Sequence, residues 1–182
     1  YPILAAILSY SLCDVEYKNY GFRLLFTRPI SKLTIYSSKI VFLLEINFIS
    51  FLIGYLAFLL SGFALDKLLP GYEFSSYNVN NLTAFYFSYL FIALSAVSIM
   101  QYYLSLIFKS FVLPIGFAGF MTIFGVIAQN KDYIYLIPYG TVWRLNYGFY
   151  SGIIDFSKGD YLNISCVLFF IIISFFVFIR KK

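Results

Sequence analysis

Four long apolar segments constrain the fold of this chain more than any other feature of its sequence. They run over residues 40–65, 84–108, 111–129 and 161–179. A helix of about 20 apolar residues crosses the roughly 30 Å hydrocarbon core of a bilayer. A soluble fold of 182 residues could not hide so much apolar surface, since 62% of the chain is hydrophobic and only 12% is charged. We therefore predict an all-α integral membrane protein, a polytopic helical bundle forming a single transmembrane domain over residues 1–182.

A fifth apolar stretch, residues 1–13, is shorter than the other four. Thirteen helical residues reach roughly 20 Å, which is less than the thickness of the hydrocarbon core. No positively charged segment stands before it, as a signal peptide would require. We expect this stretch to be part of a membrane helix whose first half lies outside the chain, so that the domain is truncated at its N-terminus.

The connections between the apolar segments differ in length and character. Only Lys109 and Ser110 separate the second and third complete segments, which predicts a tight antiparallel helical hairpin. Residues 130–160 are too apolar and aromatic for a free loop. We expect them to form an extracytoplasmic re-entrant segment of short helices, broken at Pro138, Gly140 and Gly148. An ordinary aromatic surface loop is the alternative.

The basic residues gather on one side of the predicted topology. If residues 14–39 are cytoplasmic, alternation places nine of the 13 Lys and Arg residues on that side with only two acidic residues. These nine are Lys18, Arg23, Arg28, Lys32, Lys39, Lys109, Arg180, Lys181 and Lys182. The asymmetry follows the positive-inside rule, so the basic charge indicates membrane topology and no nucleic-acid partner. We predict a multi-pass protein of a cell membrane, of the bacterial cytoplasmic type.

The stretch between the first two membrane segments is the most informative part of the sequence. Its first half interleaves aromatic and aliphatic side chains with cations, as in a short helix lying parallel to the membrane. Pro29 ends that helix, and Ser31 is placed to cap a new helix that begins near Lys32 and continues into the bilayer. Such an element can dock a soluble partner, or it can be a juxtamembrane basic loop that binds anionic lipid.

This stretch resembles one family of membrane proteins. The residues that carry the resemblance are Glu16, Tyr20-Gly21-Phe22-Arg23-Leu24-Leu25, Arg28-Pro29-Ile30-Ser31, Tyr36 and Ser38-Lys39. They look like the corresponding segment of ABC-2 type ABC transporter permeases, the membrane-spanning subunits of bacterial exporters. The resemblance implies a six-helix permease whose N-terminal helix and part of whose second helix are missing from this chain. The Lys109–Ser110 connection and residues 130–160 match the tight turn and the re-entrant region of that family.

The resemblance also implies a function and partners. Residues 14–39 would form a coupling-helix segment that docks cytoplasmic ABC ATPase subunits, and Pro29, Ser31 and Lys39 would form the turn into the third helix. The implied docking residues are Glu16, Tyr20, Phe22, Arg23, Leu24, Leu25 and Arg28. The permease would pair with a second copy or a homologous permease, surrounded by membrane lipid. It would export a hydrophobic or amphipathic substrate: a drug, an antimicrobial peptide, a lipid or a polysaccharide.

We expect no catalytic, metal or cofactor site in this chain, because it has no His and no GxxxxGK[ST] phosphate-binding motif. ATP and Mg²⁺ would bind the partner ATPase. Glu45, Asn47 and Gln101 lie within the apolar segments and form a possible intramembrane polar site. A structural role for Glu45 is the alternative, since it lies roughly 9 Å along the helix from Lys39. A polytopic scaffold or sensor-associated subunit without transport is the alternative to an exporter.

Overall fold

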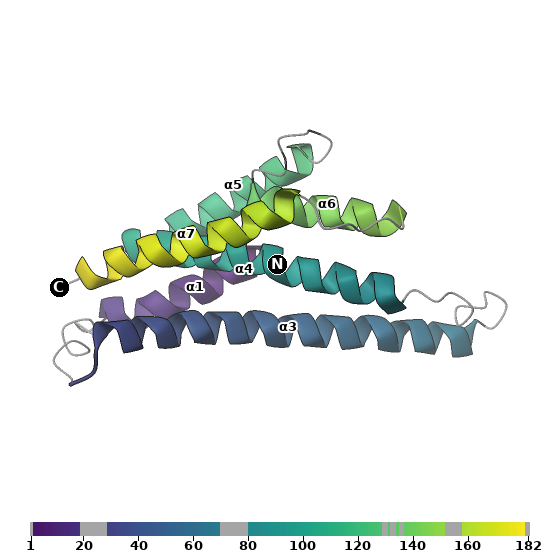
Figure 1. The fold of residues 1–182 in the computed structure, drawn as a ribbon, viewed down its shortest axis with the longest axis horizontal. Helices are drawn as coiled ribbons and strands as arrows, with labels where there is room; N and C mark the ends of the chain where they lie inside the picture. Colours follow the sequence, from purple (N-terminus) through teal and green to yellow (C-terminus); the bar gives the residue numbers. More distant parts are fainter. Residues whose placement is uncertain are drawn as a thin grey trace.

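The computed structural model describes residues 2–18, 29–69, 80–128, 131, 134, 137–151 and 158–180. Within these ranges all regular secondary structure is helical, which confirms the predicted all-α class. Six helices are described, and Figure 1 shows their arrangement. They are α1 (Pro2–Tyr17), α3 (Lys32–Leu68), α4 (Asn80–Ile107), α5 (Val112–Ala128), α6 (Pro138–Ser151) and α7 (Lys158–Arg180).

Three of these helices are long and apolar enough to cross a membrane, namely Lys32–Leu68, Asn81–Ile107 and Gly159–Arg180. Helix α5, which covers most of the predicted segment 111–129, has 17 residues. At 1.5 Å per residue it reaches about 25 Å, the lower limit for a span. Length and composition therefore make three of the four predicted complete spans long enough to cross a membrane and leave α5 as a short apolar helix.

The long helix α3 begins where the sequence predicts it. Ser31 adopts an extended backbone conformation, and its Oγ accepts a hydrogen bond from the Thr34 backbone N–H at 3.1 Å. This bond satisfies one of the N–H groups that the first helical turn leaves without a partner. The predicted N-cap is thus confirmed, and α3 continues without interruption through the first complete apolar segment.

The cap predicts a measurable contribution to stability. Replacing Ser31 with Ala should lower the free energy of unfolding by about 1 kcal/mol, because the Thr34 N–H loses its acceptor. The measurement is an SDS unfolding titration followed by circular dichroism. Ser37→Ala is the matched control, since Ser37 lies exposed within the same helix and bonds only the Thr34 carbonyl in the described structure. Equal unfolding curves for both variants would contradict the role of the cap.

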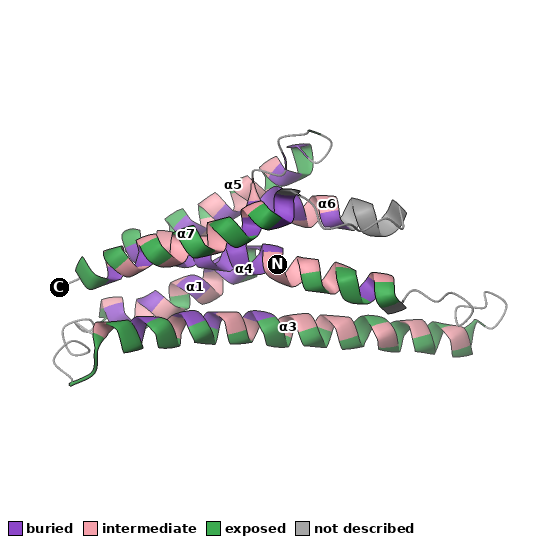
Figure 2. Ribbon diagram, in the orientation of Figure 1, coloured by how far each residue is buried: buried purple, intermediate pink, exposed green. Residues whose placement is uncertain are grey.

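Helix α4 is the centre of the bundle, and it packs against α1, α3, α6 and α7. Every residue from Ala93 to Ile99 is buried, which Figure 2 shows as the purple part of this helix. One buried cluster joins α4 to α1, α3 and α7. A second joins it to α1, α5 and α6 through small side chains such as Ala5, Ala6 and Ala118. Small side chains let helix backbones approach closely within a membrane.

The predicted α4–α5 hairpin is confirmed at its turn, because residues 108–111 alone connect the two helices. Beyond the turn the two helices diverge, and α5 packs mainly against α1 and α6 (Figure 1). The second buried cluster accounts for this divergence of α4 and α5. Ala5 and Ala6 of α1 lie in the same cluster as Val97 of α4 and Ala118 of α5.

One end of the bundle collects the cations that the topology places together. The end of α1, the start of α3, the α4–α5 turn and the end of α7 meet there (Figure 1, left). The Tyr10 hydroxyl donates to the Lys109 carbonyl at 3.3 Å, and Lys32 Nζ donates to the Ile179 carbonyl at 3.0 Å. We call this the basic end; its described cations are Lys18, Lys32, Lys39, Lys109 and Arg180.

Helix α6 corrects one prediction for residues 130–160, several of which lie outside the described ranges. The helix begins at Pro138 and runs on through Gly140 and Gly148, so the breaks predicted at the two glycines are wrong. Proline is tolerated in a first helical turn, and an interior glycine costs a helix only about 1 kcal/mol. Gly140 serves packing instead, because a Cβ at this position would overlap Ile134.

Candidate coupling region and intramembrane polar residues

The implied docking stretch is described only at its two ends. Residues 19–28 lie outside the described ranges. They include Tyr20, Phe22, Arg23, Leu24, Leu25 and Arg28 of the predicted docking residues. Glu16 precedes this stretch on α1, and Pro29, Ser31 and Lys39 follow it at the start of α3.

Glu16 and Lys39 form an ion pair inside the basic end. Lys39 Nζ lies 2.5 Å from Glu16 Oε1, and only 12% and 10% of the two side chains are exposed. Lys39 Nζ also donates to the Leu12 carbonyl at 2.8 Å. The pair therefore joins the last turns of α1 to α3. The structure gives Glu16 an internal partner, whereas the sequence places it on the docking surface.

Electrostatics make this pair sensitive to the loss of either partner. Burial raises the pKa of the Glu16 carboxyl, and the hydrogen bond and positive charge of Lys39 oppose that rise. Glu16 Oε2 has no hydrogen-bond partner among the described residues. A buried carboxylate with a single strong partner depends on that partner for its charge, because water cannot replace it.

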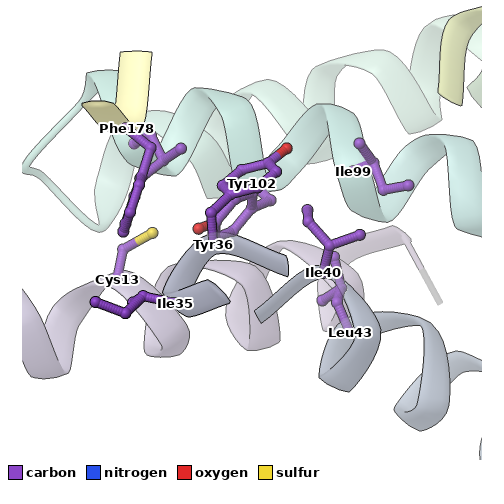
Figure 3. Packing of buried hydrophobic residues seen from close by; sticks show 9 residues of the cluster. Cys13, Ile35, Tyr36, Ile40, Leu43, Ile99, Tyr102 and Phe178 are labelled. Carbon is purple, nitrogen blue, oxygen red and sulfur yellow. The ribbon is translucent and has the colours of Figure 1, made fainter. Parts of the chain in front are cut away.

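Two further side chains at the start of α3 reach α7. Lys32 Nζ donates to the carbonyl of Ile179, in the last turn of α7, where a cation is favourable to the helix dipole. The Tyr36 hydroxyl donates to the Ile171 carbonyl at 2.7 Å and shares a hydrogen bond of 2.6 Å with Ser174 Oγ. The Tyr36 ring is buried next to Tyr102 and Phe178, as Figure 3 shows.

The predicted intramembrane polar residues do not form one site. Glu45 is exposed on α3. The 20 residues from 46 to 65 that follow it carry no charge, and they span about 30 Å as a helix. This length equals the thickness of the hydrocarbon core, and Glu45 directly precedes this uncharged segment on the side of the basic end.

Asn47 and Gln101 are both buried, but they contact different helices. Asn47 Oδ1 accepts a hydrogen bond from Ser98 Oγ at 3.2 Å, and the Ser98 carbonyl accepts one from Ser9 Oγ at 3.1 Å. These bonds join α3, α4 and α1. Gln101, one turn further along α4, donates from Nε2 to the Tyr139 hydroxyl of α6. Both groups of bonds join helices within the apolar interior, where polar side chains need internal partners.

Lys32, Tyr36 and Tyr139 make contacts between helices that the sequence analysis does not predict. Lys32, Tyr36 and Lys39 have the i, i+4, i+7 spacing of one helix face, and this signal could have grouped them. Tyr139 follows a proline in an aromatic segment, and no local pattern indicates its bond to a residue 38 positions away.

The bundle defines a class of protein: a polytopic helical membrane protein in which polar contacts join the helices at one end. The sequence matches the family model described as ABC-2 family transporter protein over residues 1–125, which includes α1, α3, α4 and most of α5. The chain therefore belongs to the ABC-2 transporter family, as its resemblance predicts. It is a permease of an ABC transporter, and membership implies association with ABC ATPase subunits.

Neither the curated proteins nor the solved structures gave a significant match.

Proposed function

We propose that this chain is the membrane subunit of an ABC exporter, and that residues 14–39 dock its cytoplasmic ATPase subunits. Family membership supports the permease assignment. The observation that carries the docking proposal is the attachment of both ends of this stretch to the bundle. Glu16 pairs with Lys39, and Lys32 bonds the end of α7. Movement of a partner that is bound between these attachments is therefore transmitted to α1, α3 and α7.

The motor and its cofactors lie on other subunits in this proposal. ATP and Mg²⁺ bind the ATPase, whose closure on ATP displaces the docked stretch. A second permease copy or a homologue completes the membrane unit. Helix α3 leaves its apolar side chains exposed along its membrane segment, which suits contact with lipid and with a second permease. The direction of transport is outward, from the cytoplasm or the inner leaflet.

The substrate class follows from the composition of the spans. The 20 residues from 46 to 65 contain no charge, and α5 carries no charge either. An ion would find few charged partners along such helices, so a hydrophobic or amphipathic cargo is favoured. Stimulation of the ATPase in lipid nanodiscs, screened over amphipathic peptides and lipids, identifies the cargo. A complex that hydrolyses ATP but moves no cargo would support the scaffold alternative instead.

Charge reversal tests the docking proposal directly. The double variant Arg23→Glu and Arg28→Glu should abolish co-purification of the ATPase and its stimulated activity. The two substitutions replace positive charge with negative charge on the surface proposed to bind the ATPase. The matched control reverses two exposed lysines on the other side of the predicted topology, Lys67→Glu and Lys131→Glu. The control should keep both properties. Co-purification that is unchanged in the Arg23 and Arg28 variant would refute docking at this stretch.

A further inference from the structure

The first two turns of α3 attach it to two helices at once. Lys32, Tyr36 and Lys39 lie on one face of the helix by their spacing. Lys39 contacts α1 through Glu16 and the Leu12 carbonyl. Lys32 and Tyr36 contact α7, and Tyr36 does so in the buried interior of the basic end.

Tyr36 makes the most directional of these contacts. Its hydroxyl bonds both the Ile171 carbonyl at 2.7 Å and Ser174 Oγ at 2.6 Å. Its ring centroid lies 5.2 Å from that of Phe175 and 5.7 Å from that of Phe178. Hydrogen bonds in a water-free interior break only at a high cost, because no solvent replaces the lost partner. Tyr36 therefore holds the start of α3 in register with the second half of α7.

The outer half of α3 is attached in a different way. Its contacts with α4 include pairs of aromatic rings, such as Phe51 with Phe87 and Tyr55 with Phe87. Ring contacts are less directional than hydrogen bonds, so they permit small sliding movements. A displacement that enters α3 at Lys32 is thus passed on most rigidly where Tyr36 holds α7.

We propose that Tyr36 is a positioning residue that transmits movement of the ATPase-docked stretch from α3 to α7. The proposal rests on the proposed function, since it requires the ATPase to move residues 14–39. In this scheme α7 moves together with α3 because the Tyr36 hydroxyl joins them at Ile171 and Ser174. Removal of that hydroxyl lets α3 move while α7 stays behind.

Tyr36→Phe tests this scheme, because it deletes the hydroxyl and keeps the ring packing. The experiment uses the transporter with its ATPase in lipid nanodiscs and two spin-label pairs, in a background with Cys13→Ala and Cys166→Ala. One pair joins α3 to α5 (Ser37→Cys with Phe120→Cys), and the other joins α7 to α5 (Phe176→Cys with Phe120→Cys). All three labelled positions are exposed. The ATPase is trapped with ATP, Mg²⁺ and vanadate.

With native Tyr36, trapping should shift the distances of both pairs. In Tyr36→Phe the α3 pair should keep its shift and the α7 pair should lose it. Ser174→Ala removes one of the two hydrogen bonds and should reduce the α7 shift, since the bond to the Ile171 carbonyl remains. Tyr55→Phe is the matched control, since it removes a hydroxyl from the same helix while its ring stacks on Phe51. Both shifts should survive in this control.

The outcomes separate the two proposals. Retention of the α7 shift in both Tyr36→Phe and Ser174→Ala would overturn the role of Tyr36, and so would a native α7 that does not move while α3 does. Failure of the ATPase to co-purify with the native chain would overturn the proposed function and the inference with it. Unchanged thermal unfolding of Tyr36→Phe would show that a lost α7 shift is not a loss of fold.

Discussion

Replacing Lys39 with Met should destabilise the protein by about 3–5 kcal/mol at neutral pH, the usual cost of removing one partner from a buried ion pair. The substitution keeps most of the side-chain volume and leaves the Glu16 carboxylate without its cation. Glu16 is 9% exposed, so water does not take the place of the ammonium group. The measurement is the free energy of unfolding from a reversible SDS titration in a fixed mixed micelle.

The pH dependence of this variant provides an independent check. Burial holds the pKa of Glu16 above its ordinary value of 4.5, and Lys39 is the group that opposes this rise. The favourable contribution of a carboxyl with a raised pKa is fully present below pH 4.5 and is lost as pH rises through the folded-state pKa. Lys39→Met removes the opposing cation, so the pKa of Glu16 in the folded state rises further. The favourable contribution of this carboxyl to stability is then lost over a wider range of pH.

The difference in stability between the native protein and Lys39→Met should therefore shrink as the pH falls from neutral toward 4.5. The double variant Glu16→Gln with Lys39→Met removes both charges, and it should recover most of the stability and lose this pH dependence. A stability difference that stays constant over this pH range would show that Lys39 acts through packing and not through the charge of Glu16.

Local sequence signals predicted the long apolar helices and the start of α3, but not the unbroken helix α6. The apolar runs located α3, α4 and α7, because hydropathy alone decides which segments of this length enter a bilayer. Ser31 was predictable as a cap because capping depends on residues three positions apart, here Ser31 and Thr34. The clustering of cations at one end followed from the alternation of spans.

Contacts between helices were not predictable in the same way. Glu16 and Lys39 are 23 positions apart, and Gln101 and Tyr139 are 38 apart. Which helices become neighbours depends on the close packing of whole helix surfaces, and no local pattern in a single sequence reveals this packing. Glycine illustrates the difficulty. The conformational freedom of glycine suggests a helix break at Gly140. In the structure the absence of a side chain at Gly140 instead leaves room for Ile134.

Gly140→Ala should accordingly be destabilising, although alanine is the better helix former. The added Cβ would overlap the Ile134 side chain and come within 3.0 Å of the Ile134 carbonyl oxygen. Ile134 is 2% exposed and has little room to move. Overpacking of this kind costs about 1–3 kcal/mol, which exceeds or offsets the gain of about 1 kcal/mol from replacing a helical glycine with alanine.

The matched control is Gly116→Ala in α5, where an added Cβ meets nothing within 4 Å. This variant has the gain in helix propensity without the overlap, so it should be as stable as the native protein or more stable. Gly140→Ala should unfold at a lower SDS fraction than Gly116→Ala. It should also change the emission of Trp143, the single tryptophan, which lies one turn further along α6.

Equal stability of the two variants would mean that α6 does not need its close approach to Ile134. A stability loss with unchanged Trp143 emission would place the strain in the connection that contains Ile134 and leave α6 in place. A loss in both measurements would show that α6 itself is displaced. Tyr139 of α6 is buried, and its hydroxyl accepts a hydrogen bond from Gln101 of α4. Displacement of α6 would also break this bond and leave both polar groups without a partner in the apolar interior.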